Sequence, residues 1–208
     1  MKFPCIYPIV NFKENAKPQA YIEQLLNAGA KLIQLRGKEI AQSDFIQIAI
    51  EALEFKNKKF PDAKIIINDS IEITRMVNAD GIHLGQGDAS VFEAKKNLRH
   101  DIITGLSTHN LEQILCAPIA SLSYIALGPI FNSKTKSGHA PEVGLTTLTA
   151  AKAKLSIPLV AIGGMALENA RKTYKAGADC LASVSDFQTN NDLYKLINDY
   201  EKIKKEIS

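Results

Sequence analysis

The sequence has 208 residues, of which 46% are hydrophobic and 23% charged, and its formal net charge is +3. This length is enough for one sizeable core, and we expect residues 1–208 to form a single domain. The small net charge gives no support for a nucleic-acid or membrane partner, and no apolar run reaches the roughly 18 residues of a transmembrane helix.

Strand and helix signals alternate along the chain. Short apolar runs that end in polar residues or glycine are typical of buried strands, and apolar residues at helical spacing predict helices between them. The predicted strands are residues 5–10, 31–35, 64–67, 81–84, a fifth that begins at 102–105, 124–127, 159–162 and 180–184. The predicted helices are residues 18–28, 43 or 44 to 57, 71–77, 91–98, 111–116, 146–154, 167–175, and 189 or 190 to 205.

This strict alternation predicts a parallel sheet, and eight repeats of it predict a closed (β/α)8 barrel, or TIM barrel. An open doubly wound sheet is the alternative. In either case the polar residues that follow the strands are expected to meet at one edge of the sheet. A TIM barrel has its active site there, so these residues are candidates whatever the reaction.

The strand-end residues include two carboxylates, Asp69 and Asp88, and three cations, Arg36, Lys38 and Lys136. Mg²⁺ prefers hard oxygen ligands and usually binds one or two carboxylates, with phosphate oxygens and water completing its shell. We therefore predict a Mg²⁺–diphosphate site. The two aspartates would bind the metal, and the three cations would bind the diphosphate.

A second anion site is expected after the seventh and eighth strands, where residues 163–164 are both glycine and residues 183–185 include two serines. Many TIM barrels bind a phosphate there on backbone N–H groups. No catalytic triad is persuasive: His83 is expected to be a core histidine, whereas His109 is a better candidate for proton transfer. The three cysteines are odd in number and without metal-ligand spacing, which fits reduced thiols in a cytoplasmic protein.

Six ordered motifs resemble those of the thiamine-phosphate synthase family over nearly the whole chain. The motifs are Gln34-Leu35-Arg36-Gly37-Lys38, Ile66-Ile67-Asn68-Asp69, residues 79–88, Gly105-Leu106-Ser107-Thr108-His109, residues 128–131 with Thr135-Lys136, and residues 158–165. The resemblance implies a transferase of thiamine biosynthesis. It would join hydroxymethylpyrimidine diphosphate to a thiazole phosphate, or to the carboxylate form of that thiazole, and release diphosphate.

The resemblance also assigns the small-molecule substrates to residues of this chain. It assigns the pyrimidine diphosphate to Gln34, Leu35, Arg36, Gly37, Lys38, Asn68, Ser107 and Lys136. It assigns the thiazole phosphate to Ser133, Lys134, Thr135, Gly164, Val184 and Ser185. The catalytic residues would be Arg36, Lys38, Ser107 and Lys136, and the Mg²⁺ ligands would be Asp69 and Asp88.

The reaction of the family looks dissociative: the bond to diphosphate breaks, a pyrimidine-methyl cation forms, and the thiazole nitrogen attacks it. Such chemistry needs no protein nucleophile, but it needs leaving-group stabilisation and the exclusion of water. Residues 132–142 carry Lys136 and are expected to close over the site as a lid. Asp186 departs from the family pattern, and its carboxylate is expected either to repel the thiazole phosphate or to cap the following helix.

Two rival functions are compatible with a barrel of this kind. The first is a thiazole tautomerase, which would need a proton shuttle such as His109 but has no evident use for a metal pair. The second is a barrel that binds thiamine precursors without catalysis, which retention of Asp69 and Asp88 argues against. A homo-oligomer is compatible with the sequence.

Overall fold

The structure is a computed structural model that describes residues 3–12, 17–132 and 141–207. Its strands are β1 (Ile6–Asn11), β2 (Leu32–Arg36), β3 (Lys64–Asn68), β4 (Gly81–Leu84), β5 (Ile103–Thr108), β6 (Tyr124–Leu127), β7 (Leu159–Ile162) and β8 (Cys180–Ser183). Each strand pairs in parallel with the next, and β8 pairs with β1, so that the sheet closes into a barrel. The predicted (β/α)8 barrel is confirmed, and the open sheet is wrong.

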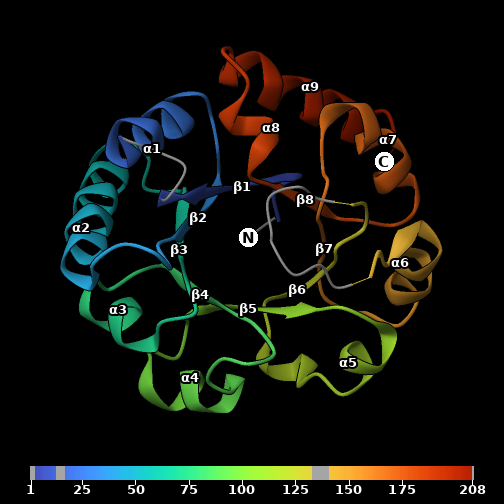
Figure 1. Ribbon diagram of the computed structural model, residues 1–208, viewed down its shortest axis with the longest axis horizontal. Coiled ribbons are helices and arrows are strands. Elements are labelled where there is room, and N and C mark those ends of the chain that lie inside the picture. Colours follow the sequence, from blue (N-terminus) through green and yellow to red (C-terminus); the bar gives the residue numbers. More distant parts are fainter. Residues whose placement is uncertain (1–2, 13–16, 133–140, 208) are drawn as a thin grey trace.

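Helices surround this barrel as an outer ring (Figure 1). They are α1 (Pro18–Asn27), α2 (Gln42–Lys59), α3 (Ile71–Met76), α4 (Val91–Asn97), α5 (Leu111–Leu115), α6 (Gly144–Lys152), α7 (Leu167–Lys175), α8 (Ser185–Gln188) and α9 (Leu193–Lys205), with a 3-10 turn at Ile119–Ser121. No helix in the described ranges is long and apolar enough to cross a membrane.

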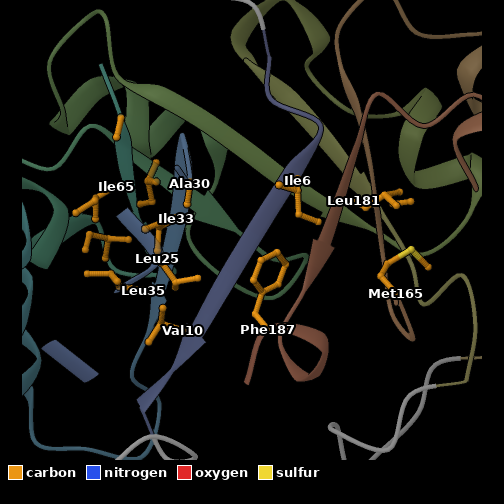
Figure 2. Packing of buried hydrophobic residues seen from close by; sticks show 14 of the residues in the cluster. Ile6, Val10, Leu25, Ala30, Ile33, Leu35, Ile65, Met165, Leu181 and Phe187 are labelled. Carbon is orange, nitrogen blue, oxygen red and sulfur yellow. The ribbon is translucent and has the colours of Figure 1, made fainter. Parts of the chain in front are cut away.

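The alternation of side chains along each strand divides the core into two layers. Ile33 and Leu35 of β2 point outward and pack against the helices, as Figure 2 shows beside Leu25 of α1. Tyr7 of β1 and Tyr124 of β6 belong instead to the smaller cluster inside the barrel. The inner layer fills the barrel interior with large side chains such as Tyr7 and Tyr124. The polar residues at the carboxyl ends of the strands lie at the open end of the barrel, which we call the mouth.

Two ion pairs, one largely buried and one partly exposed, stabilise the opposite end of the barrel. Asp80 accepts hydrogen bonds from the Ile65 N–H at 2.9 Å and from Lys56 Nζ at 3.0 Å. Asp179 repeats the arrangement with the Leu159 N–H at 2.8 Å and Lys152 Nζ at 2.6 Å. Each carboxylate holds together the starts of two neighbouring strands, which reads as a structural role at the face opposite the mouth.

The chain departs from the predicted boundaries mainly at helix starts. The N-cap of α2 is Ala41, so neither Ser43 nor Asp44 caps it. The final helix begins at Leu193, with the Asp192 side chain accepting from the Lys195 N–H at 2.9 Å. The separate short helix α8 was not predicted, because four residues are too few to show helical periodicity.

Candidate active site

A cavity of about 280 Å³ opens at the carboxyl ends of the strands. The polar and glycine residues that line it are Asn11, Gln34, Arg36, Asn68, His83, Ser107, Thr108, His109, Gly128, Gly163, Gly164, Ser183 and Ser185. A wider and more open depression of about 530 Å³ lies outside the barrel beside α4 and α5. We take the barrel mouth as the site, because strand-end side chains of several strands converge there.

The two predicted metal ligands lie together in the loops after β3 and β4, where neither lines the 280 Å³ cavity and Asp88 lines the wider depression. Asp69 directly follows β3, and hydrogen bonding links its carboxyl group to that of Asp88 in the loop after β4. The Asp69 backbone has a φ of 65°, and its N–H donates to the His83 carbonyl at 2.8 Å. A left-handed conformation costs a non-glycine residue roughly 1–2 kcal/mol, and such strain is common at functional sites.

The surroundings of the two carboxyl groups shift their pKa values in opposite directions. Burial raises the pKa of Asp69, and the neighbouring Asp88 raises it further, although Lys38 opposes the shift. Burial acts to raise the pKa of Asp88 as well, but the hydrogen bonds from Asp69 and from the Gly85 N–H outweigh it, so this pKa is lowered. Opposed shifts are expected where two carboxyl groups share a small volume.

This pair fits a hard divalent cation such as Mg²⁺. Two carboxylates brought together at a partly buried site favour a cation between them, and their oxygens are the donors that Mg²⁺ prefers. Among the described residues no group of three or more acidic, histidine or cysteine side chains gathers to hold a metal. The protein would thus supply two ligand residues and leave the other positions to phosphate oxygens and water, as is usual for Mg²⁺.

The structure describes two of the three predicted diphosphate cations, and one of them contacts the aspartate pair. Lys38 Nζ lies 2.6 Å from Asp69 Oδ2, and half of the Lys38 side chain is exposed. Arg36 lines the cavity, as does Asn68. Leu35 faces outward and is fully buried against the helices, so only its backbone is available to a substrate. Residues 133–136, which include Lys136, lie outside the described residues, as does most of the predicted lid.

A chain of buried hydrogen bonds crosses the barrel beneath the cavity. Gln34 Nε2 donates to the Tyr7 hydroxyl at 3.0 Å, and the Tyr7 and Tyr124 hydroxyls are 3.0 Å apart. Nδ1 of His83 lies 2.9 Å from the Tyr124 hydroxyl, and Nε2 lies 2.8 Å from Ser107 Oγ. His83 is buried with hydrogen-bonded ring nitrogens, as predicted, but it also lines the cavity.

Tyr7 and Tyr124 were not predicted as site residues, although both carry a signal in the sequence. Each is a polar-tipped residue at an inward position of its strand, because Ile9 and Ala126, two residues further on, also belong to the inner cluster. Neither stands at the carboxyl end of a strand: Tyr7 is the second residue of β1 and Tyr124 the first residue of β6.

The glycines after β7 form the other side of the mouth. Gly163 has a φ of 93° and Gly164 a φ of 64°, a region that favours glycine. A Cβ atom on Gly163 would lie 2.5 Å from the Cα of Pro129, and one on Gly164 would lie 2.8 Å from the Asn132 carbonyl oxygen. These close contacts with the neighbouring segment of the chain require glycine at both positions. Gly163 and Gly164 line the cavity together with Val184 and Ser185, so a ligand can reach their backbone there.

Asp186 turns away from this surface. Its carboxylate accepts a 2.5 Å hydrogen bond from the Tyr200 hydroxyl of α9 and a further one from the backbone of Leu167. It lies within α8, so the predicted alternative in which it caps the following helix is wrong, and Asp192 has that role. The tie to α9 directs the carboxylate outward, which favours a structural role over repulsion of a bound phosphate.

His109 lies at the end of β5 with one ring nitrogen engaged. Its Nδ1 lies 2.6 Å from the Gly128 carbonyl oxygen and therefore carries a proton that it donates. Its backbone N–H donates to Gln113 Oε1 at 2.7 Å. The ring is thus oriented by the protein, with Nε2 as the nitrogen left to act in the cavity that His109 lines.

Comparison with known proteins agrees with this geometry. Residues 6–187 match the family model described as thiamine monophosphate synthase. The thiamine-phosphate synthase of Dictyoglomus thermophilum is 37% identical over 174 residues, which are 84% of this chain and 77% of that protein. The thiamine-phosphate synthase of Clostridium novyi is 37% identical over 172 residues, 83% of each chain.

A solved structure gives the same result at the level of the fold. The thiamine phosphate pyrophosphorylase of Pyrococcus furiosus superposes with a TM-score of 0.86 and 28% sequence identity, covering 98% of this chain and 96% of that one. The match extends over the barrel and both sides of its mouth. On the combined evidence of sequence and fold, the chain belongs to the thiamine monophosphate synthase family.

Proposed function

We propose that this protein is a Mg²⁺-dependent thiamine-phosphate synthase. It condenses 4-amino-2-methyl-5-hydroxymethylpyrimidine diphosphate with 4-methyl-5-(2-phosphoethyl)thiazole, or its carboxylate form, to give thiamine phosphate and diphosphate. Family membership supports the transferase reaction. The observation that carries the choice of metal is the linked carboxyl pair, Asp69 and Asp88, with Lys38 beside it.

The two sides of the mouth suit the two substrates. On the first side, Asp69 and Asp88 would hold Mg²⁺, and Arg36 and Lys38 would bind the diphosphate oxygens with Lys136. On the other side, the backbone around Gly164, Val184 and Ser185 would bind the thiazole phosphate, together with residues 133–135. The pyrimidine would lie between them, near Gln34, Asn68 and Ser107.

The bound metal would neutralise charge that grows on the departing diphosphate. Arg36 and Lys38 bind that group more strongly as its charge increases, so they lower the barrier and do more than aid binding. Gln34 and Ser107 orient the pyrimidine, so that its methylene carbon faces the thiazole nitrogen. The inner cluster of Tyr7, Tyr124 and neighbouring apolar side chains closes the floor of the cavity and excludes water from the cationic intermediate.

Localisation and partners are part of the same proposal. Cys5, Cys116 and Cys180 are all free thiols, which fits the reducing cytoplasm. The partners are the two small-molecule substrates and the metal, and nothing in the charge of the chain calls for nucleic acid. Analytical ultracentrifugation tests whether the protein forms a homo-oligomer.

The test is a coupling assay with both precursors, run with and without Mg²⁺. Formation of thiamine phosphate and diphosphate in equal amounts, and loss of both with a chelator, would support the proposal. Conversion of a thiazole carboxylate phosphate in the absence of the pyrimidine would instead indicate a tautomerase. Binding of both precursors without product, at saturating Mg²⁺, would indicate a non-catalytic barrel.

A further inference from the structure

We propose that Tyr7, Tyr124 and His83 are positioning residues that set the hydrogen-bonding direction of the pyrimidine site. Through them, the Gln34 amide oxygen would be presented to the cavity as an acceptor and the Ser107 hydroxyl as a donor. This inference rests on the proposed function for the identity of the ligand. The direction of the hydrogen bonds rests only on the contacts within the barrel.

The two ends of this hydrogen-bond chain, Gln34 and Ser107, lie on different strands and line the same cavity. Gln34 belongs to β2 and Ser107 to β5, and both line the cavity. Three buried side chains join them inside the barrel, through hydrogen bonds of 2.8–3.0 Å. Tyr7 and Tyr124 are 1% and 0% exposed, so the hydrogen bond between their hydroxyls is shielded from solvent.

The direction of these bonds follows from donor and acceptor chemistry. An amide nitrogen only donates, so the Tyr7 oxygen accepts from Gln34 and the Tyr7 hydrogen is left for Tyr124. The Tyr124 oxygen accepts that hydrogen and directs its own to Nδ1 of His83. Burial raises the pKa of both tyrosines, so both remain protonated phenols.

The tautomer of His83 then fixes the role of Ser107. With Nδ1 acting as acceptor, the neutral imidazole carries its proton on Nε2, which donates to Ser107 Oγ at 2.8 Å. Ser107 Oγ accepts this bond, and its own hydrogen is left to point into the cavity. The opposite direction would require the Gln34 amide to be rotated by half a turn, which would make the amide a donor and Ser107 an acceptor.

Packing fixes the rings that carry this chain. The Tyr124 ring meets the Tyr7 ring edge-on, with centroids 5.8 Å apart, and is nearly parallel to the His83 ring at 5.5 Å. The ring fits only because residue 105 of β5 is glycine: a Cβ there would lie 2.1 Å from Tyr124 Cζ. Neither tyrosine ring can therefore leave its hydrogen-bonded position unless the inner cluster repacks.

An acceptor at Gln34 and a donor at Ser107 complement an aminopyrimidine and do not complement its oxo analogue. An aminopyrimidine edge places an N–H donor beside a ring-nitrogen acceptor, which match the Gln34 oxygen and the Ser107 hydroxyl. An oxo-pyrimidine presents a carbonyl beside a ring N–H and meets the reverse pattern. Buried polar groups that are left unpaired in this way give strong discrimination between analogues.

The first experiment is nitrogen-15 NMR of the histidine side chains in the full-length protein. The His83 signals are assigned by their loss in His83→Gln. We expect a protonated Nε2 and an unprotonated Nδ1 in the ligand-free protein, and a mixture of tautomers in Tyr124→Phe, which has no donor to Nδ1. A protonated Nδ1 in the native protein, either as the other neutral tautomer or as an imidazolium, would overturn the proposal.

The second experiment compares Tyr124→Phe with Tyr174→Phe as a matched control. Tyr174 is also buried and its hydroxyl donates to the Cys5 carbonyl at 2.8 Å, but it lies outside the cavity lining. We expect Tyr124→Phe to raise KM for the pyrimidine diphosphate about tenfold and to narrow the preference for amino over oxo substrate by a similar factor. KM for the thiazole phosphate should change less than twofold, and Tyr174→Phe should change neither constant.

The outcomes separate this inference from the proposed function. If the native protein forms no thiamine phosphate, the proposed function fails, while the NMR result still decides the donor–acceptor direction of the hydrogen-bond chain. If the protein is active but Tyr124→Phe leaves both the pyrimidine KM and the amino preference unchanged, only the inference fails. An equal rise of both KM values would mark a general loss of packing and would also overturn it.

Discussion

The Lys38 ammonium lies 2.6 Å from Asp69 Oδ2, so a protein cation partly neutralises the carboxyl pair when no substrate is bound. The same lysine is proposed to bind diphosphate, and it cannot make both contacts at full strength. Metal and Lys38 therefore compete for Asp69 in the ligand-free protein. A diphosphate that binds with the metal would draw Lys38 away from the carboxylate and end this competition.

We predict that Lys38→Met raises the affinity of the ligand-free protein for Mn²⁺, used as a probe for Mg²⁺, by about fivefold. That factor corresponds to about 1 kcal/mol, the upper range for a half-exposed ion pair. The measurement is a titration of free Mn²⁺ by electron paramagnetic resonance. Diphosphate binding, measured by calorimetry, should weaken in the same variant.

Two other charge removals control for general electrostatics in that experiment. Arg36→Met removes a cation that lines the cavity, and Lys154→Met removes one that is exposed outside it. Both should raise Mn²⁺ affinity less than Lys38→Met does. Equal effects of Lys38→Met and Arg36→Met would show that net charge, and not the contact with Asp69, sets the affinity.

Removing either carboxylate should abolish most activity. We expect Asp69→Asn and Asp88→Asn each to lower kcat by at least ~10²-fold, the scale of losing one preorganised electrostatic group. Asparagine also tolerates the left-handed backbone of Asp69, so the fold should be retained. Initial rates and Mn²⁺ titration check the effect, with the largely exposed Asp101→Asn as control. Native-like turnover in either variant would refute the metal assignment.

Gly105 is predicted to be intolerant of any side chain. A Cβ atom there would overlap the Tyr124 ring, so Gly105→Ala should lower the free energy of unfolding by roughly 1–3 kcal/mol. Urea denaturation measures this loss. Gly87→Ala is the control, because a Cβ at Gly87 would have no atom within 4 Å. The double variant Gly105→Ala/Tyr124→Leu should recover part of the stability, and if it does not, the overlap with Tyr124 is not the cause.

Asp186 should make the protein less stable as the pH rises from acid towards neutral. Burial raises the pKa of this carboxyl group in the folded protein, although the hydrogen bond from Tyr200 opposes the shift. The folded state then holds its proton more tightly than the unfolded state. The stabilisation is fully present below the unfolded pKa and is lost as the pH rises through the folded pKa.

We predict that Asp186→Asn removes this part of the pH dependence. The variant keeps an oxygen that can accept from Tyr200, so its urea midpoint should match the native protein at low pH and exceed it at pH 7. KM for the thiazole phosphate should stay unchanged, because the carboxylate faces α9. A marked fall in that KM would mean that Asp186 repels the bound phosphate after all.

Several features were determined by the sequence alone. Alternating strand and helix signals predicted the closed barrel, and parallel strands deliver all their carboxyl ends to one face, so strand-end residues could be grouped without coordinates. Asp69, Arg36 and Ser107 were predicted for this reason. Periodicity locates the body of an element but not its ends, and it therefore missed α8 and misplaced the N-cap of α2.

Only the tertiary structure decided which side chains touch. Tyr7 and Tyr124 are 117 residues apart, and no local pattern brings their hydroxyls together, because that contact depends on closure of the barrel and on the empty space at Gly105. The direction of Asp186 likewise depends on where α9 packs. The sequence supplied the chemical groups at the mouth, and the closed barrel determined their partners, since contacts across its interior depend on register and packing volume.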